Sequence, residues 1–302
     1  MNSWMRYGRR VLAAMLLSAA MGHGARAQSG AAQPGWSAVE RALGRPGATQ
    51  PDGVVRFSFP RGDLRVTVDG VQLRPALALG SWLAFRRVEG GAMAMGDLVL
   101  AEDEVAPVMT RLQEGGVRQT ALHNHVLRES PRVMYMHVEA HGDPVRIAET
   151  VRAALALSRT PLGPPGSPPA ASPIDLDTAA VARALGRSGR VNGGVYQVSV
   201  PRAETIRESG HVVPPAMGVA TAINFQPTGA GRAAITGDFV MTGGEVNPVI
   251  RALRDHGIEV TALHSHMIGE QPRLYFMHFW ANDDAVKLAR GLRAALSRMA
   301  VR

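Results

Sequence analysis

Six histidines recur in the chain as two sets with the same internal spacing. Each set has a His-x-His pair followed by a third histidine; the sets are His123, His125 and His137, then His264, His266 and His278. Side chains alternate along a β-strand, so a His-x-His pair in a strand places both imidazoles on one face. Imidazole is a common ligand of transition metals. Each set therefore predicts a site for a metal or a small polar ligand, either one site per repeat or one composite site where the two histidine-bearing faces meet.

The third histidine of a set joins this face only in one register of the predicted hairpin. Position 123 or 125 has to pair with an odd-numbered residue of the next strand. Leu122 and Val126 share one face of the first strand, while Met134, Met136 and Val138 share one face of the second. Burying both apolar groups under the helices sends all three histidines to the opposite face. The apolar pattern thus predicts that the three imidazoles converge.

Acidic residues near the histidines extend the predicted site. Glu104 and Glu245, at the start of a predicted helix in each half, are candidate oxygen ligands or general bases. Asp97 and Asp238, at the preceding strand ends, are weaker candidates for ligand binding. Three histidines with or without a carboxylate suit zinc, manganese, iron or copper, with zinc as the first choice. An open coordination position would activate a water molecule for hydrolysis.

The glutamates and two arginines also have other interpretations. Thr242 and Glu245 have the spacing of a capping box, whereas Ala101 has no hydroxyl to pair with Glu104 in the first half, which favours a functional role for that glutamate. Arg132 and Arg273 each follow a proline and are candidates for binding an anion at the mouth of the site, or else are solvated or ion-paired loop residues.

Three functions remain open on these residues. The first is a metal-binding protein, with hydrolysis by metal-activated water as the first reaction class to consider. The second is a non-catalytic envelope binding or structural protein, whose repeats associate face to face and whose histidines are structural. The third is a binder of an anionic metabolite. The chain has no cysteine and a single lysine, Lys287. It also lacks the sequence motifs of a nucleophilic serine elbow, a phosphate-binding loop and a dinucleotide-binding site, so no motif of these kinds indicates another reaction.

An internal duplication organises the whole sequence. Residues 120–155 align without a gap on residues 261–296, at an offset of 141, and about half of the aligned positions are identical. We therefore predict two domains of similar fold, residues 35–157 and 174–300. Between them, residues 158–173 hold six prolines, a composition typical of an extended, semi-rigid linker.

Strands and helices mix within each repeat without strict alternation. In the first repeat, the residue pattern predicts strands over residues 54–59, 64–68, 77–85, 92–100, 119–126 and 132–140, and helices over 104–113 and 143–157. The second repeat follows the same order, with its opening helix over residues 178–185 and Asp284 as the cap of its last helix. This predicts an α+β fold: two tandem repeats, each an antiparallel-rich sheet with helices packed on one face.

The N-terminus has the pattern of a secretory signal peptide. A positive segment with Arg6, Arg9 and Arg10 precedes a short apolar run and an Ala-x-Ala cleavage site, so residues 1–27 are expected to be removed after Ala27. Cleavage lowers the formal charge from +8 to +4. A charge this modest and scattered argues against nucleic-acid binding, and no apolar run of the mature chain is long enough to cross a membrane. We expect a periplasmic or secreted protein whose partners are a metal ion or a small molecule; the sequence names no protein partner.

Several longer motifs resemble a known family. The segments GDLVLAEDEVAPV, TALHNH and PRVMYMH, with their counterparts ITGDFVMTGGEVNPVIRAL, TALHSH and PRLYFMHFWA, resemble the LppY/LpqO family of uncharacterised bacterial proteins. The resemblance spans nearly the whole mature chain and implies export. Some members look like lipoproteins, but this chain lacks the cysteine that a lipid anchor needs. The resemblance implies no particular activity.

Overall fold

The computed structural model describes residues 35–163 and 173–302, and the predicted signal peptide lies outside this range. Both repeats belong to one compact unit, Trp36–Arg302. Within the described ranges, no helix combines the length and the apolar character needed to span a membrane.

The first repeat builds one six-stranded sheet with three main helices. In chain order its elements are α1 (Ser37–Leu43), β1 (Ala48–Thr49), η1 (Pro51–Gly53), β2 (Val54–Pro60), β3 (Thr67–Val68), β4 (Val71–Gln72), α2 (Pro75–Ala78), β5 (Gly80–Val88), β6 (Gly91–Ala101), α3 (Glu102–Glu114), β7 (Arg118–His123), β8 (Val133–Gly142) and α4 (Pro144–Leu155). The sheet order is β1-β2-β5-β6-β8-β7, and every pairing in it is antiparallel.

The second repeat has the same plan. Its elements are α5 (Thr178–Leu185), β9 (Arg190–Asn192), β10 (Val195–Pro201), β11 (Arg207–Glu208), β12 (His211–Val212), η2 (Pro215–Met217), β13 (Ala220–Gly229), β14 (Arg232–Thr242), α6 (Gly243–Asp255), β15 (Glu259–His264), β16 (Leu274–Asp284) and α7 (Ala285–Leu296). Its sheet order, β9-β10-β13-β14-β16-β15, matches that of the first repeat, so the prediction of two tandem α+β repeats is confirmed.

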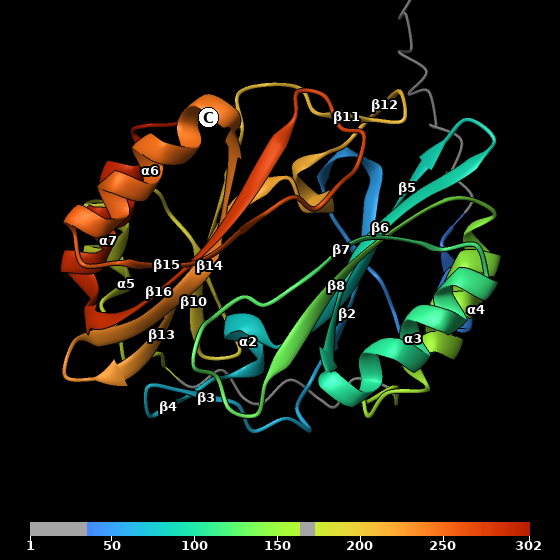
Figure 1. Cartoon of the computed structure of the whole chain (residues 1–302), viewed down its shortest axis with the longest axis horizontal. Coiled ribbons are helices and arrows are strands. Elements are labelled where there is room, and N and C mark those ends of the chain that lie inside the picture. The colour runs from blue at the N-terminus through green and yellow to red at the C-terminus, as the bar shows by residue number, and fades with distance from the viewer. Residues whose placement is uncertain (1–34, 164–172) are drawn as a thin grey trace, which may run out of the picture. The chain divides into compact units, whose positions relative to one another are not determined.

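Each sheet is buried on both faces. On β6, alternate residues such as Leu98 and Leu100 pack under the helices of the first repeat, whereas Met93, Met95 and Val99 face the other way. α3 and α4 cover the outer face of one sheet, and α5, α6 and α7 cover the outer face of the other (Figure 1). The run from Ala92 to Leu100 is almost continuously buried because it has an apolar neighbour on each side.

The inner faces of the two sheets pack against each other. One shared core joins Met93 and Met95 of the first repeat to Met217 and Phe276 of the second. Another shared core joins Val99 and Tyr135 to Ala234 and Trp280, among others. The two repeats therefore form four layers, helices, sheet, sheet and helices, and the predicted histidine face lies between the two sheets.

Three of the predicted strands have wrong bounds. Residues 64–68 contribute only the two-residue strand β3, and residues 77–78 belong to α2, so β5 begins at Gly80. The first histidine-bearing strand, β7, ends at His123 instead of continuing to Val126. The predicted linker begins as packed chain: Arg45 donates hydrogen bonds to the carbonyls of Pro161 and Gly163, while residues 164–172 lie outside the described part.

Candidate metal centre

Strand register brings the histidines of each repeat to the inner face of its sheet. His123 pairs with Tyr135, and Ala121 pairs with His137, across β7 and β8. The second repeat has the same register, with His264 opposite Phe276 and Ala262 opposite His278. The predicted odd-numbered register is confirmed. The expected burial of Leu122 and Val126 under the helices was wrong: Leu122 is 42% exposed, and Val126 packs in a core between the sheets because the chain has left the strand by then.

The middle histidine of each set reaches the cluster from beyond a strand end. β7 and β15 end at His123 and His264, so His125 and His266 belong to the loops that follow. Reciprocal hydrogen bonds tie these loops to the opposite repeat. Thr120 Oγ1 donates to the carbonyl of His266 at 2.6 Å, and Thr261 Oγ1 donates to the carbonyl of His125 at 2.5 Å. The two bonds are related by the repeat offset, which indicates a pseudo-twofold arrangement.

The six histidines meet in one cluster between the sheets. Across the repeat boundary, the ring centroids of His123 and His264 lie 3.5 Å apart, and those of His137 and His266 also lie 3.5 Å apart. The centroids of His125 and His278 are 3.8 Å apart. The geometry is therefore that of one composite site to which both repeats contribute.

The ε-nitrogens of all six histidines are free to bind a ligand. Each Nε2 is buried and has no hydrogen-bond partner within residues 35–163 and 173–302. The δ-nitrogen of His278 donates to the carbonyl of Gly237 at 2.7 Å, and that of His123 donates to the carbonyl of Asn124 at 3.0 Å. A proton held on Nδ1 leaves the Nε2 lone pair available to a metal.

The ligand atoms lie close enough to share ions. In one group, the nitrogens of His123, His125 and His137 lie within 4.8 Å of one another, and in a second group so do those of His123, His264, His266 and His278. Two ligands that each lie about 2.1 Å from one ion are separated by roughly 3–4 Å. Small side-chain adjustments would bring each group into coordinating geometry.

Asp97 and Asp238 add one carboxylate from each repeat. Asp97 Oδ1 lies 3.8 Å from His137 Nε2, and Asp238 Oδ2 lies 3.4 Å from His266 Nε2. The Oδ1 atoms of both aspartates are buried and unpaired in the described part of the chain. Asp97 and Asp238, which were weaker candidates than the two glutamates in the sequence, are thus the carboxylates that lie beside the histidines.

Burial shifts the protonation of this cluster toward neutral groups. Desolvation lowers the pKa of His123 to about 4 and that of His264 to about 3, and it lowers the pKa values of the other four histidines well below the usual range. Desolvation also raises the pKa of Asp97 to about 7, against the opposing charge of Arg56. Neutral imidazoles are the form that binds metal.

Glycines let the neighbouring strands approach beside the aspartates. A Cβ on Gly237 would lie 1.9 Å from the carbonyl oxygen of Ala222, and one on Gly96 would lie 2.6 Å from that of Trp82. In each of the two repeated Gly-Asp pairs, the glycine therefore allows the neighbouring strand to approach closely, and the aspartate that follows places its carboxylate on the inner face. Thr120, Thr261 and these glycines were not predicted as site residues; their repetition at the same offset was the available signal.

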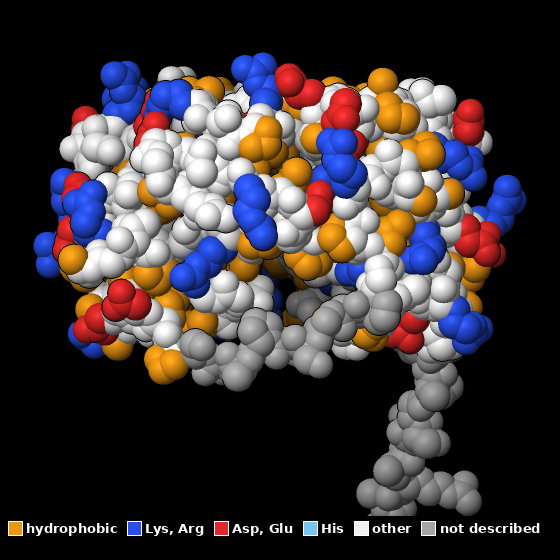
Figure 2. Space-filling view, turned by 90° about the horizontal axis from the view of Figure 1, so that it is seen from below, with side chains coloured by type: hydrophobic (Ala, Val, Ile, Leu, Met, Phe, Trp, Pro, Cys, Tyr) orange, Lys and Arg blue, Asp and Glu red, His pale blue; other side chains and the backbone are white. Residues whose placement is uncertain are grey.

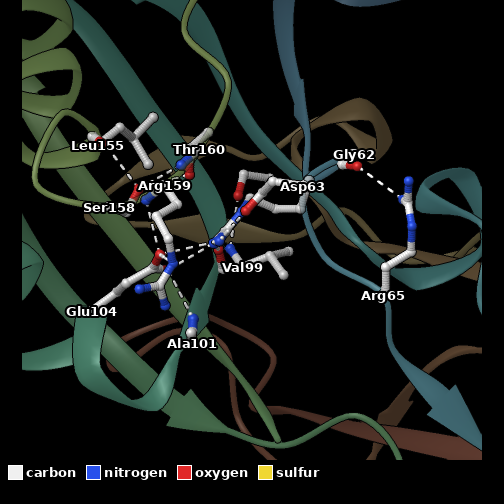
Figure 3. A network of polar contacts seen from close by, with 12 residues as sticks. Gly62, Asp63, Arg65, Val99, Ala101, Glu104, Leu155, Ser158, Arg159 and Thr160 are labelled. Atoms are coloured by element: carbon white, nitrogen blue, oxygen red, sulfur yellow. Dashed lines mark hydrogen bonds and ion pairs between the residues drawn. The ribbon is translucent and has the colours of Figure 1, made fainter. Parts of the chain in front are cut away.

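Glu104 and Glu245 are not part of the cluster. Glu104 forms a buried ion pair with Arg61, with 2.7 Å between Oε2 and Nη1, and it accepts hydrogen bonds from the backbone N–H groups of Ala101 and Arg159, both drawn in Figure 3. Glu245 pairs in the same way with Arg202 at 2.8 Å and accepts from the N–H of Thr242.

These contacts overturn the expected role of the two glutamates. Both oxygens of each carboxylate are engaged in charge-assisted bonds, so neither glutamate is free to ligate a metal or accept a substrate proton. The argument from Ala101 was also wrong. Only the threonine half of the capping box needs a hydroxyl, and the glutamate half forms in both repeats.

Arg132 and Arg273 likewise have contacts outside the cluster. Arg132 is exposed and lies 3.8 Å from Glu102. Arg273 pairs with Glu270 at 3.2 Å and donates to the carbonyls of Met267 and Ile268. These contacts favour the alternative interpretation, in which both arginines are ion-paired loop residues.

A small cavity adjoins the cluster on one side. It has a volume of about 10 Å³ and is bounded by His137 and His266 together with Trp82, Met95, Met217 and Met267, among others. A space of this size holds about one water molecule. The arrangement can thus place a single water-sized ligand next to histidines of both repeats.

The outer surface gives no comparable focus of charge on the face drawn in Figure 2. Lys and Arg side chains lie interspersed there with Asp and Glu, and hydrophobic side chains are scattered among them. This face therefore holds no cluster of charged side chains comparable to the histidine cluster between the sheets.

Comparison with protein families accounts for both repeats. The profile of one family matches residues 37–157 and again residues 179–298. The chain belongs to the family described as Domain of Unknown Function (DUF1259). Each match covers one sheet with its helices, so this chain carries the DUF1259 domain twice. The resemblance to the LppY/LpqO family stays a prediction.

Other comparisons add little to the DUF1259 assignment. No curated protein matches the chain. Among solved structures, the trimeric bacterial microcompartment shell protein PduB is 13% identical, with 83% of this chain and 90% of that chain covered and a TM-score of 0.20. EtuB from Clostridium kluyveri is 11% identical with the same coverage and the same TM-score.

Proposed function

We propose that this protein is an exported metal-binding protein in which the two repeats together form one centre for a divalent transition metal. One observation carries the proposal: six buried imidazoles from both repeats converge with every Nε2 unpaired among the described residues. An unsatisfied buried polar atom costs about 1–3 kcal/mol. Six of them in one place are costly for a structural cluster, and metal coordination would satisfy them.

The donor chemistry narrows the ion. Imidazole nitrogens with a minority of carboxylate oxygens suit zinc, iron, manganese or copper, and zinc remains the first choice. Magnesium and calcium prefer all-oxygen sites. Thiolate-rich coordination is excluded because the chain has no cysteine.

Hydrolysis by metal-activated water is the reaction class that we propose to test first. The neighbouring cavity of about 10 Å³ fits the required water molecule but not a larger substrate. A substrate of greater size would therefore need the loops that carry His125 and His266 to open. Metal binding itself does not depend on this step.

The alternative of structural histidines predicts a different pattern of contacts. In that alternative, the histidines hydrogen-bond across the interface between the repeats. The rings stack across that interface instead, and their ε-nitrogens find no partners in the described chain. This pattern favours metal binding over a purely structural role.

Metal content measured by mass spectrometry tests the proposal. The protein is purified from residue 28 onward without a histidine tag, beside a double variant His123→Ala, His264→Ala and a control His256→Gln. His256 lies outside the cluster, where its Nδ1 donates to the carbonyl of Ala252. We expect near-stoichiometric metal in the wild type and the control, and its loss in the double variant. Protein that stays metal-free after reconstitution with zinc, iron, manganese and copper would refute the proposal.

Export is a separate part of the proposal, supported by the residue pattern of the first 27 positions. N-terminal sequencing of protein recovered from the periplasm or medium should begin at Gln28. Protein that keeps Met1 and stays inside the cell would overturn this part and leave metal binding unaffected.

A further inference from the structure

The number of free donor atoms in the centre exceeds the needs of one ion. Eight buried atoms in the cluster lack hydrogen-bond partners within the described ranges: the six histidine Nε2 atoms and the Oδ1 atoms of Asp97 and Asp238. A first-row divalent ion takes about four to six ligands in proteins. A single ion would therefore leave two or more buried donors unsatisfied, each at a cost of about 1–3 kcal/mol.

The donors separate into two groups by position. His123, His125 and His137 form one group, and His264, His266 and His278, with His123 again in range, form the other. Each group belongs to one repeat apart from the shared His123. The division therefore follows the pseudo-twofold relation between the repeats.

One aspartate accompanies each group. The carboxylate of Asp97 lies 3.9 Å from His125 Nε2 and 3.8 Å from His137 Nε2, while that of Asp238 lies 3.4 Å from His266 Nε2. These separations are close to those between two ligands of the same ion. Each repeat thus supplies three imidazoles and one carboxylate, a set sufficient for one ion.

The surroundings also suit a pair of ions. His123 belongs to both groups, so the two metal positions are adjacent. The cavity of about 10 Å³ touches His137 of the first group and His266 of the second, so one water or hydroxide would fit beside both. An anionic oxygen there would offset part of the positive charge that two ions bring to two carboxylates.

We propose that the centre is dinuclear, with one divalent transition-metal ion held by Asp97, His125 and His137 and a second held by Asp238, His266 and His278. His123 and His264 complete the two coordination spheres. This inference rests on the proposed function and adds to it the number of ions and their assignment to the repeats. Two ions about 3.5–4 Å apart can act jointly on one bound oxygen.

Cobalt(II) is the probe for the test, because its absorption and magnetism report coordination and coupling. The wild type is compared with two half-site variants, Asp97→Asn with His125→Gln, and Asp238→Asn with His266→Gln, and with the control His256→Gln. We expect about two cobalt ions per chain in the wild type and control, and about one in each half-site variant. Magnetic coupling between the ions should be present in the wild type and lost in both variants.

The possible results separate the two proposals. One ion per chain in the wild type, with both half-site variants losing it, would overturn the dinuclear centre and leave the metal-binding function standing. No bound ion in the wild type would overturn both. Circular dichroism and thermal unfolding of each variant show whether it is folded, and single variants Asp97→Asn and Asp238→Asn provide milder changes if a double variant does not fold.

Discussion

At the scale of single residues, burial decides what the histidines can do. An exposed histidine titrates near pH 6.5, but desolvation keeps all six imidazoles of the cluster neutral and their pKa values low. In the folded metal-free protein, their lone pairs stay available to a metal well below neutral pH. The same burial raises the pKa of Asp97 to about 7, so a metal has to displace a proton from this carboxyl near neutrality.

The histidine pKa values predict that metal-free protein loses stability in acid. His123 has a pKa of about 4 in the folded state and about 6.5 when unfolded. Below about pH 6.5 the unfolded chain therefore binds more protons, and stability falls as the pH falls toward 4. Asp97, Asp238, Glu129 and Glu208 act in the opposite direction, since burial raises their pKa values, but the six histidines outnumber them.

Urea unfolding of the metal-free protein between pH 5 and pH 8 checks this expectation. A variant His123→Gln, His264→Gln should show a shallower loss of stability with falling pH, because two of the titrating groups are gone. Stability that stays constant or rises from pH 6.5 to pH 5 in the wild type would contradict the burial of neutral histidines.

Glu104 carries a prediction of a different kind. Its replacement in Glu104→Gln removes the charge that pairs with buried Arg61, so we expect a loss of about 2–4 kcal/mol in the free energy of unfolding, less than for an isolated pair because Asp63 remains. The matched change Glu102→Gln, at an exposed glutamate of the same helix, should cost less than about 0.5 kcal/mol. Metal content should be unchanged in both, and metal loss in folded Glu104→Gln would return Glu104 to the list of ligands.

At the scale of elements, strand register and the loops after β7 and β15 build the centre. The register of β7 against β8 agrees with the prediction, but only the apolar residues of β8 behave as expected, with Met136 and Val138 under the helices. On the β7 side, Leu122 is 42% exposed and Val126 lies between the sheets. Apolar alternation also did not predict where β7 ends. His125 lies in a loop whose backbone is held by a hydrogen bond from Thr261 of the other repeat. The pattern of neighbouring residues in the sequence cannot predict such a contact.

The threonine bonds between the repeats give a prediction for these loops. In the double variant Thr120→Val, Thr261→Val, each valine keeps the shape of threonine but removes one hydrogen bond to a loop carbonyl. We expect metal affinity to fall by roughly 10-fold or more, as for other groups that orient metal ligands. Competition with a chromophoric chelator measures the affinity.

Thr228→Val is the control for this pair. Thr228 donates to Asn282 Oδ1, away from the centre, so its loss should leave metal affinity unchanged. Equal affinities for the wild type and the double variant would show that the loops hold His125 and His266 without the threonine bonds.

At the scale of the whole molecule, the interface between the repeats is a core and not a contact of exposed surfaces. Residues from both repeats in the shared cores are almost fully buried, among them Met93 and Tyr135 of the first and Phe276 and Trp280 of the second. Separation of the repeats would expose both inner faces and divide the histidine cluster.

A cut between the repeats should therefore leave the centre intact. With a protease site introduced within residues 164–172, the cleaved protein is expected to elute as one complex and to keep its metal, because the buried interface still holds the two repeats together after cleavage. Size-exclusion chromatography with metal analysis checks this. Two fragments that separate without denaturant, each folded, would show that the repeats are independent domains.

The duplication, the α+β class, the register of the histidine strands and the identity of the six histidines could be predicted from the residues alone. These follow from local periodicity and from the comparison of the chain with itself, which need no knowledge of distant contacts. The folded chain was needed to show that the two histidine sets face each other and that Asp97 and Asp238, among the candidate carboxylates, are the ones beside them. It was also needed to show that Glu104 and Glu245 form ion pairs with Arg61 and Arg202. The reason is that each of these contacts joins residues of distant segments, and burial between two sheets, not spacing along the chain, decides which polar groups find partners.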